Sequence, residues 1–366
     1  MHPVNRSTVR TAGALATVAV VAAATLGQAG TAGAQVPARS VVASGLVTPL
    51  TAGIQSNGTA FVSENFAGLL VKIRPGHAPK PVFRAKKGVE VGGVTADPGQ
   101  VTFTLTIGGG GPEAPATRSF VMHRTSGKVT RFANTGAFER NNNPDAGVTY
   151  GFRNLGKRCL SKVPKQIPAR YHGVVDTHPY STATSGGTTY VGDAAGNDIL
   201  SIDSAGHIKL VTVMPAVPLL ITKHRAQLNK LPACAVGHRY WFESVPTDVE
   251  VAPDGGLVVT TLTGATEGPG FGPQSRVYRV STGGSKTLVA KHLAGAVGVA
   301  IAPNGSYLVS QLFGNVVSRV DQNTGAVSQF RSVFQPAAVE EANGQVYVTS
   351  RVLVQKPTGR LLRFPN

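Results

Sequence analysis

In the stretch APNGSYLVSQ (residues 302–311), an Asn-Gly turn is followed directly by a run in which apolar and polar side chains alternate. Alternation with a period of two is typical of a β-strand with one buried face, and Asn-Gly readily adopts the positive φ angles of a tight hairpin turn. Five other turn sites recur along the chain, each between two short β-like runs. The six sites are Asn57-Gly58, Pro98-Gly99, Gly186-Gly187, Asp254-Gly255, Asn304-Gly305 and Asn343-Gly344.

Each of these hairpin units continues into a third apolar run, and in most of them a second turn leads to a fourth. The last unit reaches Asn366 before a fourth strand, whereas SVVASGL at 40–46 precedes the first unit as an unassigned strand. If that strand completes the last unit, the sheets close into a ring and two open edges disappear. The sequence therefore predicts an all-β fold, a six-bladed β-propeller whose N-terminal strand closes the last blade.

Length and composition agree with this fold. The 366 residues include 44 Gly and 24 Pro, with 42% hydrophobic and 14% charged residues, which excludes a coiled coil or a charged disordered polymer. Without two long irregular stretches, 133–173 and 215–244, about 43 residues remain for each unit, as in other propeller repeats. A pair of β-sandwiches is the structural alternative, but it would not repeat one turn signature six times.

The N-terminus resembles an export signal. Arg6 and Arg10 precede an uncharged apolar run from Thr11 to Gly27, and Ala32-Gly33-Ala34 offers a cleavage site before Gln35. We therefore expect a signal peptide over 1–34, a secreted mature propeller over 35–366, and no membrane span in that mature chain. A retained N-terminal anchor is the alternative, although the run is short and rich in Gly and Ala.

The predicted export bears on the oxidation state of the two cysteines. In an oxidising compartment an even pair, here Cys159 and Cys234, is most simply a disulfide. A zinc site is disfavoured because neither cysteine belongs to a Cys-x-x-Cys pair, while two free buried thiols remain an alternative. The two residues fall in the two long insertions, so their bond would staple the end of the ring on which the long loops lie.

Positive charge concentrates in the same insertions. The chain has a net charge of +17, and residues 133–173 hold seven Lys or Arg against two acids, while 215–244 hold four against one. Such a surface attracts an acidic cell-envelope polymer or an acidic protein, although exposed loops also carry charge without binding anything. Nucleic acid is disfavoured because no recognition motif is present. The predicted partner face includes Arg158, Lys162 and Lys165.

Three segments, VVDTHPY (174–180), TTYVGDAAGNDILSID (188–203) and VPTDVEVAPDG (245–255), resemble the ScyD/ScyE family of secreted propeller proteins. The resemblance covers most of the mature chain and implies an NHL-type or lactonase-like six-bladed propeller. It implies no settled biochemical role. One departure is that the family usually has Asp-Ser-Asn-Pro where this chain has Asp176-Thr177-His178-Pro179.

Carboxylates near the ring axis are the candidates for a metal site. Ca²⁺ prefers oxygen ligands and can polarise a carbonyl or phosphoryl group, and lactonase-like propellers use an axial metal of this kind. The candidate ligands are Asp176, Asp248, Glu64 and Asp193. In the alternative interpretation each acid caps a turn through backbone N–H groups. No nucleophile elbow, His-Glu-x-x-His motif or phosphate loop is present in the sequence.

Aromatic residues flank the insertions and complete the set of candidates. Amphipathic rings are favoured at binding surfaces, but they also anchor long loops as small cores. Trp241 and Phe242 are assigned to such a core, and His178, Tyr180, Tyr171 and Tyr240 to a ligand or partner face. The sequence thus predicts a monomeric secreted binding module with no certain cofactor. The alternative function is a Ca²⁺-dependent lactonase-type hydrolase with an axial site.

Overall fold

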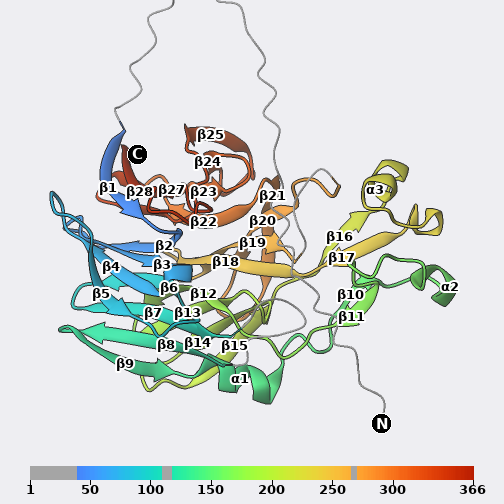
Figure 1. Cartoon of the computed structure of the whole chain (residues 1–366), viewed down its shortest axis with the longest axis horizontal. Coiled ribbons are helices and arrows are strands. Elements are labelled where there is room, and N and C mark those ends of the chain that lie inside the picture. Colours follow the sequence, from blue (N-terminus) through green and yellow to red (C-terminus); the bar gives the residue numbers. More distant parts are fainter. Residues whose placement is uncertain (1–38, 109–117, 265–269) are drawn as a thin grey trace, which may run out of the picture. The chain divides into compact units, whose positions relative to one another are not determined.

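The computed structural model describes residues 39–108, 118–264 and 270–366, and the predicted signal peptide over 1–34 lies outside them. The described strands form antiparallel four-stranded sheets, six of which are successive blades (Figure 1). Blades 1 to 3 consist of β2 (Pro49–Ile54), β3 (Ala60–Glu64), β4 (Leu69–Ile73) and β5 (Lys80–Arg84); β6 (Val89–Asp97), β7 (Gln100–Ile107), β8 (Arg118–Thr125) and β9 (Lys128–Ala133); and β12 (Pro179–Ser185), β13 (Thr188–Asp193), β14 (Asp198–Ile202) and β15 (Ile208–Val213).

The other three blades complete the ring. Blade 4 consists of β18 (Ser244–Val251), β19 (Leu257–Thr263), β20 (Ser275–Val280) and β21 (Lys286–Leu293), and blade 5 of β22 (Ala296–Ile301), β23 (Tyr307–Gln311), β24 (Val316–Val320) and β25 (Val327–Ser332). Blade 6 combines β26 (Val339–Ala342), β27 (Gln345–Ser350) and β28 (Gly359–Pro365) with β1 (Ser40–Leu46).

The first strands of the blades form the inside of the ring. Strands β2, β6, β12, β18, β22 and β26 contact one another in that order, and β26 contacts β2 to close the circle. Strand β1 pairs antiparallel with β28, with Val41 opposite Leu362. The six-bladed propeller and its closure by the N-terminal strand are therefore confirmed.

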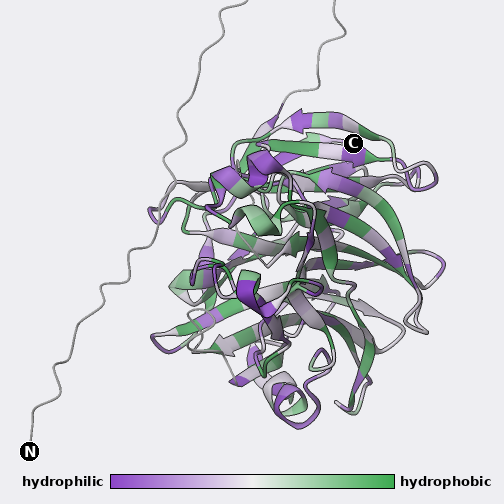
Figure 2. Ribbon diagram, turned by 90° about the vertical axis from the view of Figure 1, so that its right-hand side faces the viewer, coloured by the Kyte–Doolittle hydropathy of each residue, from purple (hydrophilic) through white to green (hydrophobic). Residues whose placement is uncertain are grey.

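The repeated turns behave as their sequence indicates. The second residue of every turn dipeptide is a glycine whose φ lies between +73° and +83°, a region that other residues rarely adopt. Along the strands, apolar and polar residues alternate in bands, and many of the connecting turns are hydrophilic (Figure 2). Apolar side chains from neighbouring blades pack together, as Val258 and Val277 of blade 4 do with Val299 and Tyr307 of blade 5.

The two long insertions, 133–173 and 215–244, were expected to be irregular, but they contain strands and short helices. Their short strands come together in a seventh sheet, in the order β11, β10, β17, β16, which stands to one side of the blades (Figure 1). We call residues 149–172 and 217–242 the insertion lobe. It contains β10 (Thr149–Phe152), α2 (Lys157–Leu160), β11 (Arg170–His172), β16 (Val217–Leu220), α3 (Lys223–Leu228), η2 (Ala233–Ala235) and β17 (Arg239–Phe242); helix α1 (Thr135–Asn142) precedes it.

The insertion lobe has an apolar core of its own. Phe152, Leu219, Tyr240 and Phe242 are buried in it together with Leu155 and other aliphatic residues. Sheet pairing between β10 and β17 joins the two insertions, although blade 3 separates them in the sequence. Among the helices of the described ranges, none has the length and apolar character that crossing a membrane requires.

Candidate functional site

A polar cluster joins blades 1, 2 and 3 close to the inner strands. Glu90 lies in β6, and its Oε2 is 3.2 Å from Nε2 of His178, which directly precedes β12. Its other oxygen accepts a hydrogen bond from Nδ2 of Asn65 at 3.0 Å. The ring of Tyr180 stands edge-on to His178, with the centroids 5.6 Å apart. His178 and Tyr180 were predicted site residues, whereas Glu90 was not, because it lies far from His178 in the chain.

The Glu90–His178 contact favours the charged forms of both groups. Burial opposes the charge on His178, but the contact with Glu90 and the fields of Asp193 and Asp176 outweigh it and raise the histidine pKa above 6.5. Burial likewise opposes the charge on Glu90, but His178 and Asn65 outweigh it and hold the carboxyl pKa below 4.5. The contact therefore stabilises the ionised forms of both side chains near the axis of the ring.

Replacing Glu90 by glutamine is expected to lower the pKa of His178, because the amide removes the negative charge while burial still disfavours the imidazolium. The pKa can be measured from the pH dependence of the imidazole proton resonances in NMR spectra. Stability contributed by the raised histidine pKa is fully present below about 6.5 and is lost as the pH rises through the pKa of the folded state. The Asp203→Asn variant, in an exposed turn, is the control; an unchanged His178 pKa in Glu90→Gln would contradict the assignment.

Two of the predicted metal ligands, Asp176 and Asp193, lie at one end of blade 3. Oδ1 of Asp193 accepts backbone N–H groups from His178 at 2.6 Å, Gly196 at 3.0 Å and Ala195 at 3.1 Å. Its Oδ2 accepts the hydroxyl of Thr177 at 2.6 Å. The carboxylate thus holds the chain at the ends of β12 and β13, as the turn-capping interpretation expects.

The other two candidates lie on different blades. Glu64, at the end of β3, accepts the N–H of Val47 at 3.1 Å, and burial raises its pKa. Asp248, in β18, accepts the N–H groups of Val249 at 2.9 Å and Val299 at 2.8 Å. Across the part of the chain that the structure describes, no three His, Cys, Asp or Glu side chains stand in the arrangement of metal ligands. An axial metal site remains a prediction.

Asp248 has acidic neighbours that the sequence analysis did not identify. Together with Glu250 of β18 and Glu340 of β26 it lines a cavity of about 10 Å³ between the inner strands, room for about one water molecule. Burial raises the pKa of Asp248 to about 7, and burial together with repulsion among the acids raises the pKa values of Glu250 and Glu340 well above their ordinary value. Asp248 and Glu250 are neighbours on β18, and only the closed ring brings Glu340 of β26 to them.

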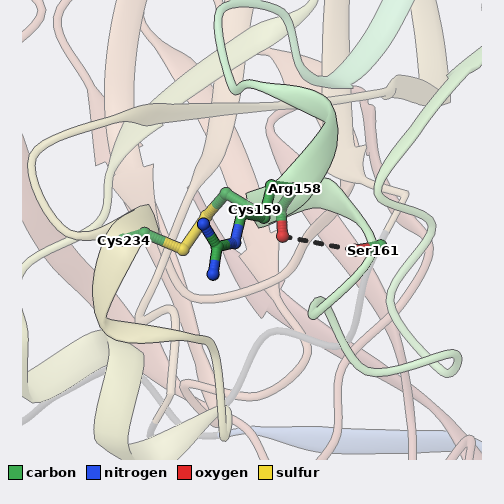
Figure 3. The surroundings of a disulfide bond; sticks show 4 residues. All are labelled: Arg158, Cys159, Ser161 and Cys234. Atoms are coloured by element: carbon green, nitrogen blue, oxygen red, sulfur yellow. Dashed lines mark hydrogen bonds between the residues drawn. A yellow bond between two sulfur atoms is a disulfide. The ribbon is translucent and has the colours of Figure 1, made fainter.

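The predicted disulfide cross-links the two parts of the insertion lobe. Cys159 of α2 and Cys234 of η2 are bonded with an S–S length of 2.06 Å and a Cα–Cα distance of 6.1 Å (Figure 3). The pairing predicted from the sequence is confirmed. Because the two cysteines belong to different insertions, the bond fixes α2 to the segment that follows α3.

The charges of the insertion lobe all have one sign. Residues 149–172 and 217–242 contain ten Lys or Arg and no Asp or Glu. The predicted partner residues Arg158, Lys162 and Lys165 are exposed, as is Lys157 on α2. The lobe therefore presents a concentrated positive surface. The acids of the two insertions lie outside the lobe, whose limits the seventh sheet defines.

Two arginines of this surface are held in place by the backbone. The guanidinium of Arg170 donates to the carbonyl oxygens of Phe152 at 2.7 Å, Arg153 at 2.7 Å and Leu155 at 3.0 Å. Arg153 donates to Thr149 at 2.8 Å and stacks over the ring of Trp241 at 3.8 Å. With Thr149 and His172 they line an open groove of about 420 Å³. Ordered cationic groups lose less conformational entropy when an anion binds.

The tyrosines of the predicted face are mostly turned inward. Tyr240 is 3% exposed and donates its hydroxyl to the carbonyl oxygen of Pro168 at 2.8 Å, so it belongs to the core of the lobe and not to a binding surface. Tyr171 is half-buried against Tyr150 and hydrogen-bonds to Glu243. Of the residues assigned to a core, Phe242 is buried, whereas Trp241 stays partly exposed beneath Arg153.

Comparisons with known proteins define the fold class. No protein-family model matches the chain, and no curated protein matches it. Among solved structures it is similar to a glucose dehydrogenase (10% identity, 90% of this chain and 100% of that chain, TM-score 0.56). It is also similar to the PQQ-bound aldose sugar dehydrogenase from Streptomyces coelicolor (13%, 89% and 97%, 0.54) and to a putative glucose dehydrogenase from Thermus thermophilus (16%, 89% and 99%, 0.51).

At these identities the similarity shows the fold alone: the chain is a β-propeller, as those enzymes are. The more specific resemblance to the ScyD/ScyE family stays a prediction.

Proposed function

We propose that the protein is an exported propeller that binds an acidic polymer of the cell envelope through its insertion lobe. The observation that carries this proposal is the charge of the lobe, ten basic residues without an acid. A repeating anionic polymer can contact many such cations at once, so weak individual contacts add up. The basic groove around Arg153 and Arg170 offers a fixed starting point for such contacts.

Export belongs to the same proposal. A disulfide between two loops is typical of an oxidising compartment, and the N-terminal 34 residues have the composition of a signal peptide. A mature protein that begins at Gln35 is the expected product of secretion. Intact mass of the protein recovered from the culture medium tests this expectation.

Replacing Lys157, Arg158, Lys162 and Lys165 together by glutamine is expected to weaken binding to fluorescein-labelled polygalacturonate about tenfold. The reason is that each exposed charge contact contributes about 0.3–0.5 kcal/mol at low salt, and four of them correspond to about one power of ten in Kd. Fluorescence anisotropy at low ionic strength measures the change.

A matched control exists on blade 1. Replacing Arg74, Lys80, Lys86 and Lys87 by glutamine removes the same number of lysines and arginines from exposed positions. If the lobe is the binding surface, this variant keeps nearly the affinity of the wild type. Equal losses in both variants would show that net charge alone attracts the polymer, and the proposal would fail.

A Ca²⁺-dependent hydrolase of lactonase type, with an axial site, is the second candidate. The observation that favours it is the set of acids, Asp248, Glu250 and Glu340, around one axial cavity. Hydrolysis of lactones or phosphoesters that requires Ca²⁺ and disappears in Asp248→Asn would support it. Absence of any such hydrolysis by the wild type at saturating Ca²⁺ would count against it.

A further inference from the structure

A second group of acids lies away from the axis, where helix α1 packs against blades 2 and 3. Glu139 on α1 and Asp145 after it face Asn197 and Asp198, at the start of β14. Nδ2 of Asn197 donates to Oδ2 of Asp145 at 3.0 Å, and the hydroxyl of Tyr150 donates to the same oxygen at 2.9 Å. The first insertion and the blade therefore meet through side chains that are almost all acceptors.

Most of these acceptors have no hydrogen-bond donor. Asp198 is 1% exposed and neither of its oxygens is bonded, while Glu139, at 2% exposure, and Asp145, at 1%, each leave one oxygen unbonded. Oδ1 of Asn143 and Oδ1 of Asn197 are buried and unbonded as well. The described residues contain seven buried carboxylate or amide oxygens without a partner, and six of them are here. A buried carboxylate without a donor either keeps its proton or is balanced by a positive charge.

The electrostatics of the cluster are consistent with a missing positive charge. Burial raises the pKa of Glu139 to about 8, with repulsion from Asp193, Asp145 and Asp176 acting in the same direction. The pKa of Asp198 is raised more strongly, by burial and then by Asp193, Glu139 and Asp145. Repulsion among the acids thus adds to the effect of burial, and a cation among them would reverse the sign of that interaction.

The carboxyl group of Asp145 lies directly against the backbone at Gly173. A Cβ atom added to Gly173 would collide with the carboxyl group of Asp145, so only glycine allows the chain to pass there. The amide of Asn143 donates to the carbonyl oxygen of Gly173 at 3.4 Å, which turns its own Oδ1 away from that bond.

We propose that Glu139, Asn143, Asp145, Asn197 and Asp198 form a Ca²⁺ site that fixes helix α1, and with it the first insertion, to blade 3. Ca²⁺ binds six to eight oxygens in flexible geometry, whereas Mg²⁺ requires a near-ideal octahedron and retains its water. The three carboxylates do not yet surround one point, so binding includes rotations of their side chains. This site shares no residue with the predicted axial one, and it adjoins one candidate of that set, because Asp193 lies opposite Asp198 in the sheet.

The proposal is tested by the melting temperature of the purified protein in EDTA, in CaCl₂ and in MgCl₂. Ca²⁺ at a hundredfold excess over its Kd is expected to raise the melting temperature by about 4 °C, because it binds only the folded state. Mg²⁺ at the same concentration is expected to raise it less. Terbium luminescence gives a second reading, since Tyr150 next to Asp145 can sensitise a bound Tb³⁺ ion, and Ca²⁺ should displace it.

Two isosteric variants locate the ion. Asp198→Asn is expected to melt no lower than the wild type in EDTA, because it removes a buried charge, and to lose the Ca²⁺ response. Glu139→Gln gives the same reading if Asp198→Asn does not fold. Asp321→Asn, in the exposed turn between β24 and β25, is the matched control and should keep the full response. A wild type without a Ca²⁺ response, or a response that survives in Asp198→Asn and Glu139→Gln, would overturn the proposal. Neither outcome bears on polymer binding by the insertion lobe.

Discussion

Removal of the disulfide, by replacing Cys159 and Cys234 with alanine, is expected to lower the free energy of unfolding of the insertion lobe by about 4 kcal/mol. The bond closes a loop with a sequence separation of 75 residues, and that loop contains the whole of blade 3. Without it, the unfolded chain gains freedom, and only the short strands β10 and β17 and the small apolar core hold the two insertions together.

This loss can be measured in the lobe alone. Trp241, in β17, is the only tryptophan of the chain, so its fluorescence reports the lobe while far-UV circular dichroism reports mainly the blades. In a guanidinium titration the fluorescence midpoint of the variant should fall well below its circular dichroism midpoint. Wild-type protein treated with reductant should behave as the variant does. A variant whose two midpoints both match the oxidised wild type would show that the bond does not stabilise the lobe.

The second large effect is expected in the ring itself. Phe103 of β7 is fully buried between blades 1 and 2, where it contacts Phe83 at 5.0 Å between ring centroids and packs in one cluster with Phe61 and Val91. Its replacement by alanine should destabilise the protein by about 3–5 kcal/mol, because the transfer energy of the ring is lost and a cavity remains.

Chemical unfolding followed by far-UV circular dichroism measures that change. Phe66→Ala is the control, because this side chain is 64% exposed and its removal leaves no cavity. The midpoint of the control should stay close to that of the wild type. If Phe103→Ala and Phe66→Ala shifted the midpoint equally, the packing between blades 1 and 2 would not be as described.

The repeated hairpins made the ring predictable from the sequence. Each turn glycine has to adopt a positive φ, as Gly305 does at +82°, and each following strand alternates in a way that leaves one face apolar. Both signals are local, so they can be recognised in a single sequence without an alignment. The closing strand was predictable for a related reason, because 40–46 had no partner and the last unit lacked one strand.

The insertion lobe could not be predicted in the same way. Its strands are three or four residues long, too short for a periodic pattern, and they pair across a blade that separates them in the sequence. For that reason 133–173 and 215–244 were expected to be irregular, and Tyr240 was placed on a surface. The disulfide was predictable because cysteine has few alternatives outside the cytosol.

The charged sites likewise include some that a local sequence signal marks and others that only the folded ring brings together. Basic residues of the lobe are visible in the sequence as an excess of Lys and Arg, but the complete absence of acids appears only once its boundaries are known. Glu90 beside His178, and Glu139 near Asp198, come from elements far apart in the chain. No local signal marks such pairs, since their proximity is a product of the ring.

The most direct test of lobe-mediated binding is amide hydrogen exchange of the purified protein with and without polygalacturonate at low salt. Slower exchange is expected in peptides from 149–172 and 217–242, and this protection should disappear when salt screens the charges. Protection confined to the blades, or no protection at polymer concentrations that saturate the anisotropy signal, would contradict the claim that the insertion lobe is the binding surface.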